Sequence, residues 1–150
     1  YFVELADKVS EDEVIVLVGL TDKQMNQIPE NIIGITRTNN VDELVDIYSS
    51  ADIFVNPTLE DNFPTTNLEA LACGTPVITF DTGGSGESIS NNCGYVLDEN
   101  SISQIYEKIQ DNKRKGKSKL ENSLRQHAEN FYDKNVKYGE YIDLYKLLNP

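Results

Sequence analysis

Short apolar segments alternate with amphipathic segments through most of the chain, and this alternation constrains the fold more than any other feature. The clearest apolar segment, EVIVLVG at 13–19, is apolar at consecutive positions, which is typical of a parallel strand covered on both faces. Four further strands are expected at 31–36, 52–55, 77–80 and 94–97. Strands separated by helices predict an α/β domain of Rossmann-like type, with a parallel sheet and helices on both faces.

The segments between and after these strands are predicted helices. Apolar residues recur in them at helical spacing, as at Val41, Leu44, Val45 and Tyr48. The expected helices cover 2–9, 22–28, 41–49, 67–73, 101–109, 118–130 and 133–148. The last of them is rich in tyrosine and leucine, which we interpret as packing residues rather than a platform for a ligand.

Composition excludes some classes of function. The 150 residues carry a net charge of -12, with 25 acidic and 13 basic side chains, which argues against a nucleic-acid-binding protein. Cys73 and Cys93 lack the spacing of metal ligands and are expected to be free thiols in a reducing cytosol. No apolar run approaches the length of a membrane span. We therefore expect one cytoplasmic domain over 1–150.

A cluster of basic residues allows two interpretations. The segment 111–119 contains five of them, namely Lys113, Arg114, Lys115, Lys117 and Lys119. One interpretation is a peripheral contact with the anionic inner face of a membrane. The other, which we favour, is a solvated linker followed by the start of a helix, because five dispersed charges fall short of a strong polybasic patch.

The most unusual sequence is the run NPTLEDNFPTTNLEALACGTPVITFDTGGSGE at 56–87. It begins where the expected strand 52–55 ends and includes the strand 77–80, so two successive strands end in distinctive loops. The carboxyl-end loops of a parallel sheet are where α/β proteins bind ligands. The first loop carries acidic residues. The second contains the glycine-rich turn 83–86, whose spacing differs from that of a dinucleotide fingerprint and which alone indicates only a turn.

Two carboxylates in this run are candidate ligand-binding groups. Asp61 and Glu69 are eight residues apart, so a loop residue and a residue one turn into a helix can converge on one ligand. A carboxylate accepts hydrogen bonds from vicinal hydroxyls, such as those of a ribose or a hexose. The amides of Thr65, Thr66 and Asn67 open the helix between them, at the end of the helix dipole that suits a diphosphate.

Both carboxylates also have purely structural interpretations. Thr66-Asn67-Leu68-Glu69 fits the capping box S/T-x-x-E, in which Glu69 folds back onto the Thr66 amide. Local sequence alone favours this cap over a ligand role. Asp61 could equally hydrogen-bond the nearby backbone of its loop. His127 has no recognisable catalytic partner, so we expect it to be packed or at the surface.

The run strongly resembles the donor-site signature of the family-4 retaining glycosyltransferases. The matching pattern is Asp61, seven residues, Glu69, then Ala-x-Ala-x-Gly-x-Pro-Val at 70–77 and Gly83-Gly84 followed by Glu87. The resemblance extends over nearly the whole chain. It implies one lobe of a GT-B fold, the C-terminal donor-binding lobe. The acceptor lobe and the first strand of this lobe would then lie upstream of Tyr1, and the fragment alone would be inactive.

The resemblance also implies roles for individual residues. Asp61 and Glu69 are the candidate catalytic residues, Asp61 holding hydroxyls of the donor sugar and Glu69 those of the ribose, rather than acting as an acid–base pair. The family usually has Glu-Gly where this chain has Asp61-Asn62, so Glu60 is an alternative to Asp61. The implied substrate-binding residues are Asn62, Phe63, Pro64, Thr65 and Thr66 for sugar and diphosphate, Arg37 and Thr38 for the nucleobase, and Gly84.

The implied reaction is transfer of a hexose from a nucleotide diphosphate sugar of UDP or GDP type to a hydroxyl, with retention at the anomeric carbon. No cofactor and no metal are implied. The acceptor would be a glycan or a lipid-linked molecule held by the other lobe, in the synthesis of bacterial surface polysaccharide such as capsule. The main alternative is a non-catalytic nucleotide-binding or scaffold module of the same fold. A nucleotide-sugar epimerase ranks below both.

Overall fold

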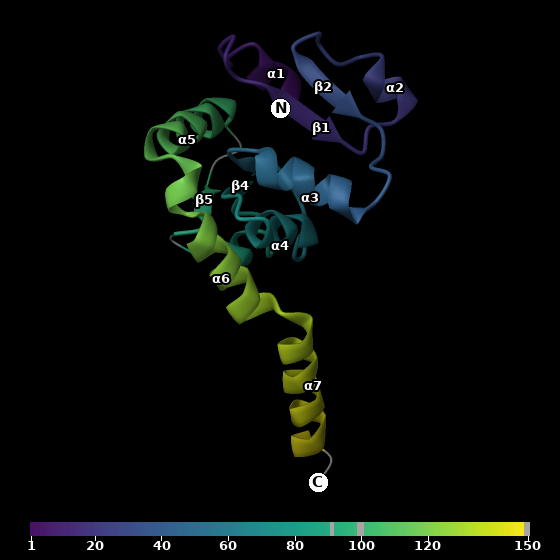
Figure 1. The fold of residues 1–150 in the computed structure, drawn as a ribbon, viewed down its shortest axis with the longest axis vertical. Helices are drawn as coiled ribbons and strands as arrows, with labels where there is room; N and C mark the ends of the chain where they lie inside the picture. Colours follow the sequence, from purple (N-terminus) through teal and green to yellow (C-terminus); the bar gives the residue numbers. More distant parts are fainter. Residues whose placement is uncertain (91, 99–100, 149–150) are drawn as a thin grey trace.

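The computed structural model describes residues 1–90, 92–98 and 101–148. Its strands are β1 (Ile15–Val18), β2 (Ile32–Ile35), β3 (Phe54–Asn56), β4 (Val77–Phe80) and β5 (Gly94–Leu97). Its α-helices are α1 (Phe2–Ala6), α2 (Asp22–Met25), α3 (Val41–Ser50), α4 (Thr65–Ala72), α5 (Ile102–Lys115), α6 (Glu121–Tyr132) and α7 (Lys134–Leu148) (Figure 1). All five predicted strands are confirmed, and so is the α/β class.

The strands form two hydrogen-bonded sheets. β1 pairs with β2, and β3, β4 and β5 form a second sheet in that order. Every pairing is parallel. Among the described residues no ladder joins the two sheets, so the predicted parallel sheet is divided into a two-stranded and a three-stranded part.

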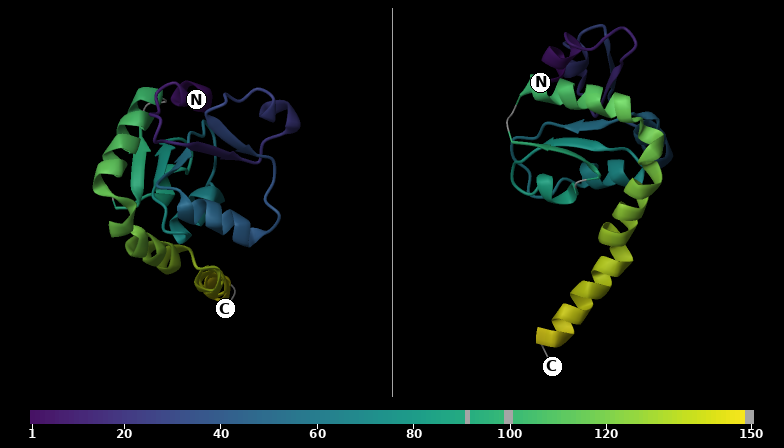
Figure 2. Two further views of the ribbon diagram at one scale, coloured as in Figure 1. Left: turned by 45° about the horizontal axis from the view of Figure 1, so that its top comes forward. Right: turned by 90° about the vertical axis from the view of Figure 1, so that its left-hand side faces the viewer.

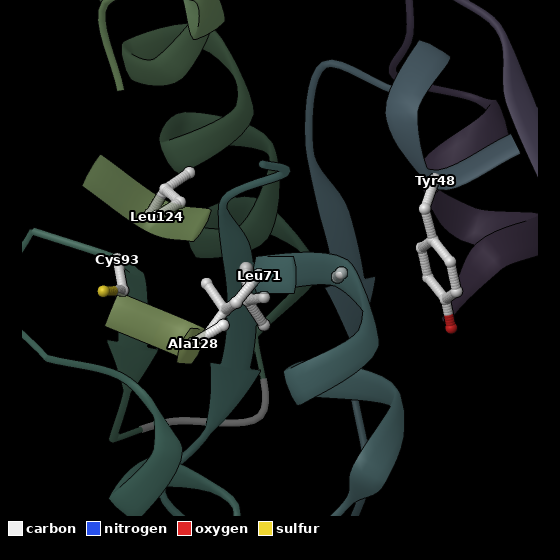
Figure 3. Close-up of a cluster of buried hydrophobic side chains, with 7 residues drawn as sticks. Tyr48, Leu71, Cys93, Leu124 and Ala128 are labelled. Atoms are coloured by element: carbon white, nitrogen blue, oxygen red, sulfur yellow. The ribbon is translucent and has the colours of Figure 1, made fainter. Parts of the chain in front are cut away.

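β4 lies at the centre of the core, and all four of its residues are buried. Successive side chains of a strand point to opposite faces of the sheet. Val77 packs in a cluster with Leu71 of α4. Figure 3 shows this cluster, with Leu71 labelled. Ile78 and Phe80 pack in a second cluster with Ile105 of α5. Figure 2 shows α4 and α5 on opposite faces of this sheet, as the alternation predicts.

β1 is less covered than its sequence predicts. Ile15 packs against the cluster that contains Phe80. Val16 and Val18, which point the other way, are 42% and 39% exposed. The prediction of a strand covered on both faces is therefore wrong for β1, because one face of the two-stranded sheet is open to solvent.

Several helix ends differ from expectation. α2 ends at Met25 rather than at residue 28, and α4 begins at Thr65, two residues earlier than predicted. α5 continues to Lys115, so the first half of the basic segment is helix rather than linker. Gly116 ends α5 with a φ of 78°, a conformation that glycine adopts without strain.

The basic residues form contacts within the molecule. Lys113 is 2.7 Å from Asp12, and Lys115 is 2.7 Å from Asp111. Lys117 donates to backbone carbonyls at the end of α3. These contacts support the structural interpretation of the segment, and a peripheral membrane contact stays a prediction. No described helix is both long and apolar enough to cross a bilayer.

α7 extends away from the rest of the chain (Figures 1 and 2). None of its described residues is buried. Tyr138, Tyr141 and Tyr145 are 66%, 61% and 66% exposed. The interpretation of these tyrosines as packing residues is therefore wrong for the described part of the chain, because no described element buries them.

Candidate functional site

Two loops lie side by side at the carboxyl ends of β3 and β4. One leads from β3 to α4 and the other follows β4. The Thr82 hydroxyl donates to the carbonyl oxygen of Thr58 at 2.8 Å. The Gly84 amide donates to the carbonyl oxygen of Asp61 at 3.0 Å. The structure thus brings together the acidic loop and the glycine-rich turn that the sequence placed on successive strands.

Glycine is required where these loops touch. A Cβ atom on Gly83 would lie 2.1 Å from the carbonyl oxygen of Asp61, and one on Gly84 would lie 1.9 Å from that of Asn62. Backbone atoms cannot move aside as a side chain can. The buried Gly84 therefore supports the acidic loop, and its amide is already bonded. A direct contact between Gly84 and a substrate stays a prediction.

Asp61 fixes the conformation of its own loop. Its Oδ1 atom accepts a hydrogen bond from the Phe63 amide at 3.0 Å, which is an Asx turn. The structural interpretation of Asp61 is therefore observed. A carboxylate has further acceptor capacity at its second oxygen, and the side chain is partly exposed, so a ligand role remains open to it. Glu60, the preceding residue, is exposed and remains the alternative to Asp61 as the sugar-binding carboxylate.

Glu69 does not form the capping box that its sequence suggests. Pro64 is the N-cap of α4, and no side chain caps this end of the helix. Thr66 is already the second helical residue, so the expectation that Thr66 caps α4 is also wrong. The Oε2 atom of Glu69 instead accepts a hydrogen bond from the Tyr48 hydroxyl of α3 at 3.1 Å. The capping box does not form because α4 begins at Thr65, which places Thr66 inside the helix.

Tyr48 is a site residue that the sequence analysis missed. Its side chain is 8% exposed, and its ring packs edge-on against Phe54. Burial, and then the charge of Glu69, raise the pKa of Tyr48 well above its usual value, so the hydroxyl stays a hydrogen-bond donor. The buried Tyr48 hydroxyl therefore orients the carboxylate of the exposed Glu69. The only sequence signal was a tyrosine on an otherwise aliphatic helix face.

The first turn of α4 lies between Asp61 and Glu69 in the chain. Helix geometry leaves the amides of Thr65 and Thr66 without intrahelical acceptors, and both residues are exposed. The Asn67 amide, which was expected to be available too, instead donates to the Pro64 carbonyl at 3.2 Å. The helix dipole adds positive potential here, so the amides of Thr65 and Thr66 can stabilise an anionic group.

Phe63 borders an aromatic cluster at the end of α6. Its ring centroid lies 5.9 Å from that of Tyr132, beside a hollow of about 460 Å³. His127 packs against Phe131 and Tyr132, with centroid distances of 4.8 and 5.7 Å. The expectation that His127 is a packed residue is confirmed.

Arg37 and Thr38 lie elsewhere, in the turn after β2 at the carboxyl end of the two-stranded sheet. In the described parts of the chain, no hydrogen bond or ion pair joins either residue to the loops after β3 and β4. Their contact with a nucleobase stays a prediction. Over the same ranges, no group of three His, Cys, Asp or Glu side chains is arranged to hold a metal ion.

The family model for glycosyl transferases group 1 matches residues 4–131. The chain belongs to this family. A segment of 50 residues is 42% identical to the D-inositol 3-phosphate glycosyltransferase of Rhodococcus jostii (strain RHA1), and it covers 33% of this chain but only 11% of that protein.

Solved glycosyltransferase structures share the fold. The structure of a glycosyltransferase from Rickettsia africae ESF-5 aligns with a TM-score of 0.80 at 21% identity, over 99% of this chain and 44% of that one. Anabaena HepE in complex with UDP-glucose aligns with a TM-score of 0.73 at 14% identity, over 96% of this chain and 43% of that one. The predicted Rossmann-like lobe of a GT-B glycosyltransferase is therefore confirmed as a fold, and the chain spans less than half of either protein.

Proposed function

We propose that this member of the family is the donor-binding lobe of an enzyme that transfers a hexose from a nucleotide diphosphate sugar to an acceptor hydroxyl, with retention. The observation that carries the proposal is the Glu69 carboxylate, which Tyr48 holds at the surface of α4, one turn after the amino end of the helix and eight residues after Asp61. These groups suit three parts of one ligand: ribose hydroxyls, diphosphate and sugar hydroxyls. A structural neighbour of the same fold was solved with UDP-glucose, which supports this class of ligand.

The chemistry would consist mainly of binding and charge stabilisation. Negative charge grows on the departing diphosphate as its bond to the anomeric carbon breaks. The amides of Thr65 and Thr66 would stabilise that charge at the amino end of α4. Glu69 would fix the ribose, and Asp61 or Glu60 would fix the sugar. Arg37 and Thr38 would contact the base through the turn after β2.

The acceptor, a glycan or a lipid-linked molecule, would bind to a second lobe, with a role in surface polysaccharide synthesis. The predicted first strand of the donor lobe would fit between β1 and β3. The support for this is that both strands belong to parallel sheets and that no ladder joins them in the described chain.

Calorimetric titration with UDP, GDP, ADP and their sugars tests the proposal on the protein at its natural length. We expect saturable binding of at least one of them. Glu69→Ala should weaken that binding by roughly tenfold or more, because it removes charged hydrogen-bond acceptors for the ribose. Glu129→Ala, at an exposed position of α6, is the matched control and should bind as the wild type does. Absence of saturable binding at millimolar ligand would refute the proposal.

Glu69→Gln separates the donor site from the alternative of a scaffold module. Glutamine keeps an acceptor for the Tyr48 hydroxyl but loses the charge that strengthens bonds to ribose. A donor site predicts weaker nucleotide binding with little change in the free energy of unfolding. A scaffold predicts that Glu69→Ala lowers this free energy by about 1 kcal/mol, through loss of the Tyr48 bond, and leaves any nucleotide binding unchanged.

A further inference from the structure

Asn67 of α4 is a fully buried polar residue, with 0% of its surface exposed. Its carboxamide can donate two hydrogen bonds and accept two. Its Oδ1 atom accepts from the Nδ2 atom of Asn56 at 2.9 Å. Its Nδ2 atom donates to the Ser85 carbonyl at 3.2 Å and contacts the Ser88 hydroxyl at 3.3 Å. One side chain therefore joins the end of β3, the first turn of α4 and the turn after β4.

Thr79 closes this network from β4. Its hydroxyl lies 2.5 Å from the Ser85 hydroxyl and 3.0 Å from the Asn56 carbonyl oxygen, to which it donates. Thr79, Ser85 and Ser88 are each 0% exposed. A buried polar group costs free energy unless it is hydrogen-bonded, and a partly broken network leaves several groups unpaired. The network therefore favours a single relative placement of the elements that it joins.

Each branch of the network ends next to the proposed donor site. Asn56 precedes the loop that carries Asp61, and Asn67 precedes Glu69 by two residues. Ser85 follows Gly84, whose amide donates to the Asp61 carbonyl. An apolar side chain would bury this face of α4 equally well, so packing alone does not account for an asparagine at position 67.

We propose that Asn67 is a positioning residue for the nucleotide-sugar donor. It sets the spacing between the Asp61 loop, the amino end of α4 and the Gly83-Gly84 turn. Because it is fully buried, it acts through the backbone of these elements and does not touch the ligand. The inference rests on the proposed donor site.

Asn112 provides a matched control. It is a second buried helical asparagine, 2% exposed, and its Nδ2 atom donates to the Asp52 carbonyl at 3.0 Å. Asn67 thus holds the carboxyl end of β3, at the site, while Asn112 holds the segment before β3, at the opposite end. The test compares Asn67→Leu with Asn112→Leu in the protein at its natural length. Its readouts are titration with whichever of UDP and GDP the wild type binds, and hydrogen exchange at the Gly84 amide.

Both variants should be less stable than the wild type, but only Asn67→Leu should disturb the site. We expect it to bind the nucleotide roughly tenfold or more weakly, because small displacements of binding groups have large effects. We also expect faster exchange of the Gly84 amide, whose acceptor is the Asp61 carbonyl. Equal affinity and equal Gly84 exchange in the two variants would overturn the inference.

A milder variant covers the case in which Asn67→Leu does not fold. Ser88→Ala removes two hydrogen bonds at the edge of the network, the one from Asn67 and the one to the Ser85 carbonyl oxygen, and should show the same two changes at smaller size. If the Gly84 amide then exchanged at the same rate in Ser88→Ala as in the wild type, the inference would be overturned. Lack of nucleotide binding by the wild type would refute the donor site itself, whereas Gly84 exchange still decides whether Asn67 positions the loop.

Discussion

β1 and β4 have similar sequences but differ in burial. Each is a run of mainly β-branched and aliphatic residues, yet every residue of β4 is buried while β1 alternates between half-buried and exposed positions. β4 pairs with a strand on each side and lies between α4 and α5, whereas β1 has a single partner, β2, among the described strands. An apolar run thus identifies a strand, but the neighbours of that strand decide whether it becomes core.

The largest expected effect comes from the same truncation made in each sheet. Ile78 of β4 is 0% exposed, and Ile33 of β2 is 53% exposed. Ile78→Ala should lower the free energy of unfolding by about 2–5 kcal/mol, because it leaves a cavity in a packed core. Ile33→Ala should cost less than about 1 kcal/mol, because much of the removed surface already faces water. Denaturant unfolding measures both, and equal losses would contradict the difference drawn between the sheets.

Two glycines sharpen the comparison. A Cβ atom on Gly94 of β5 would lie 1.9 Å from the Val77 carbonyl oxygen, and the φ of Gly94 is 156°. A Cβ atom on Gly34 of β2 would lie 2.5 and 2.7 Å from the ends of the Met25 and Ile28 side chains. Gly94→Ala should therefore cost about 1–3 kcal/mol, because backbone must move.

Gly34→Ala should cost less than about 1 kcal/mol, because a methionine side chain can repack around a methyl group. Thermal unfolding of the two variants side by side checks this pair. A larger loss for Gly34→Ala would mean that the two-stranded sheet is the more tightly packed of the two.

The sequence predicted the strands well because their apolar runs are local and are bounded by polar turns. It also placed the acidic loop and the glycine-rich turn at strand ends, where the structure brings them together. It failed where a contact joins distant segments. The bond from Tyr48 to Glu69 spans 21 residues, and those from Asn67 to Asn56 and Ser85 span 11 and 18. No local pattern marks such partners, and the local pattern at Thr66 indicated a cap that does not form.

A smaller effect is expected at the connection between the two sheets. α3 leads from β2 to β3, and the Lys117 ammonium donates to the Ser49 and Ala51 carbonyls at its end. Lys117→Met keeps the aliphatic stem but leaves these carbonyls without that donor, so the free energy of unfolding should fall by about 1 kcal/mol. Lys119→Met, at an exposed position, is the control and should change little. Equal losses in urea unfolding would show that Lys117 does not hold this connection.

The smallest effect is a pH dependence confined to the region around β1. Lys113 and Ser10 hydrogen-bond to Asp12, just before β1, and lower the pKa of Asp12 from 3.8 to about 2. Since the folded value lies below the unfolded one, this contribution to stability is present above pH 3.8 and is lost as the pH falls towards about 2. The pair is exposed, so salt should weaken it.

Hydrogen exchange at the amides of β1 and β4 measures this dependence. Protection of the β1 amides should fall over that pH range before protection of β4 falls, because β4 depends on apolar burial and β1 has an exposed face. Asp12→Asn should remove the part of the β1 transition that Asp12 causes, since asparagine does not titrate. An unchanged β1 transition in this variant would show that packing on α1 and α5, rather than this ion pair, stabilises the two-stranded sheet. β1 and β4 would then both be stabilised mainly by apolar burial.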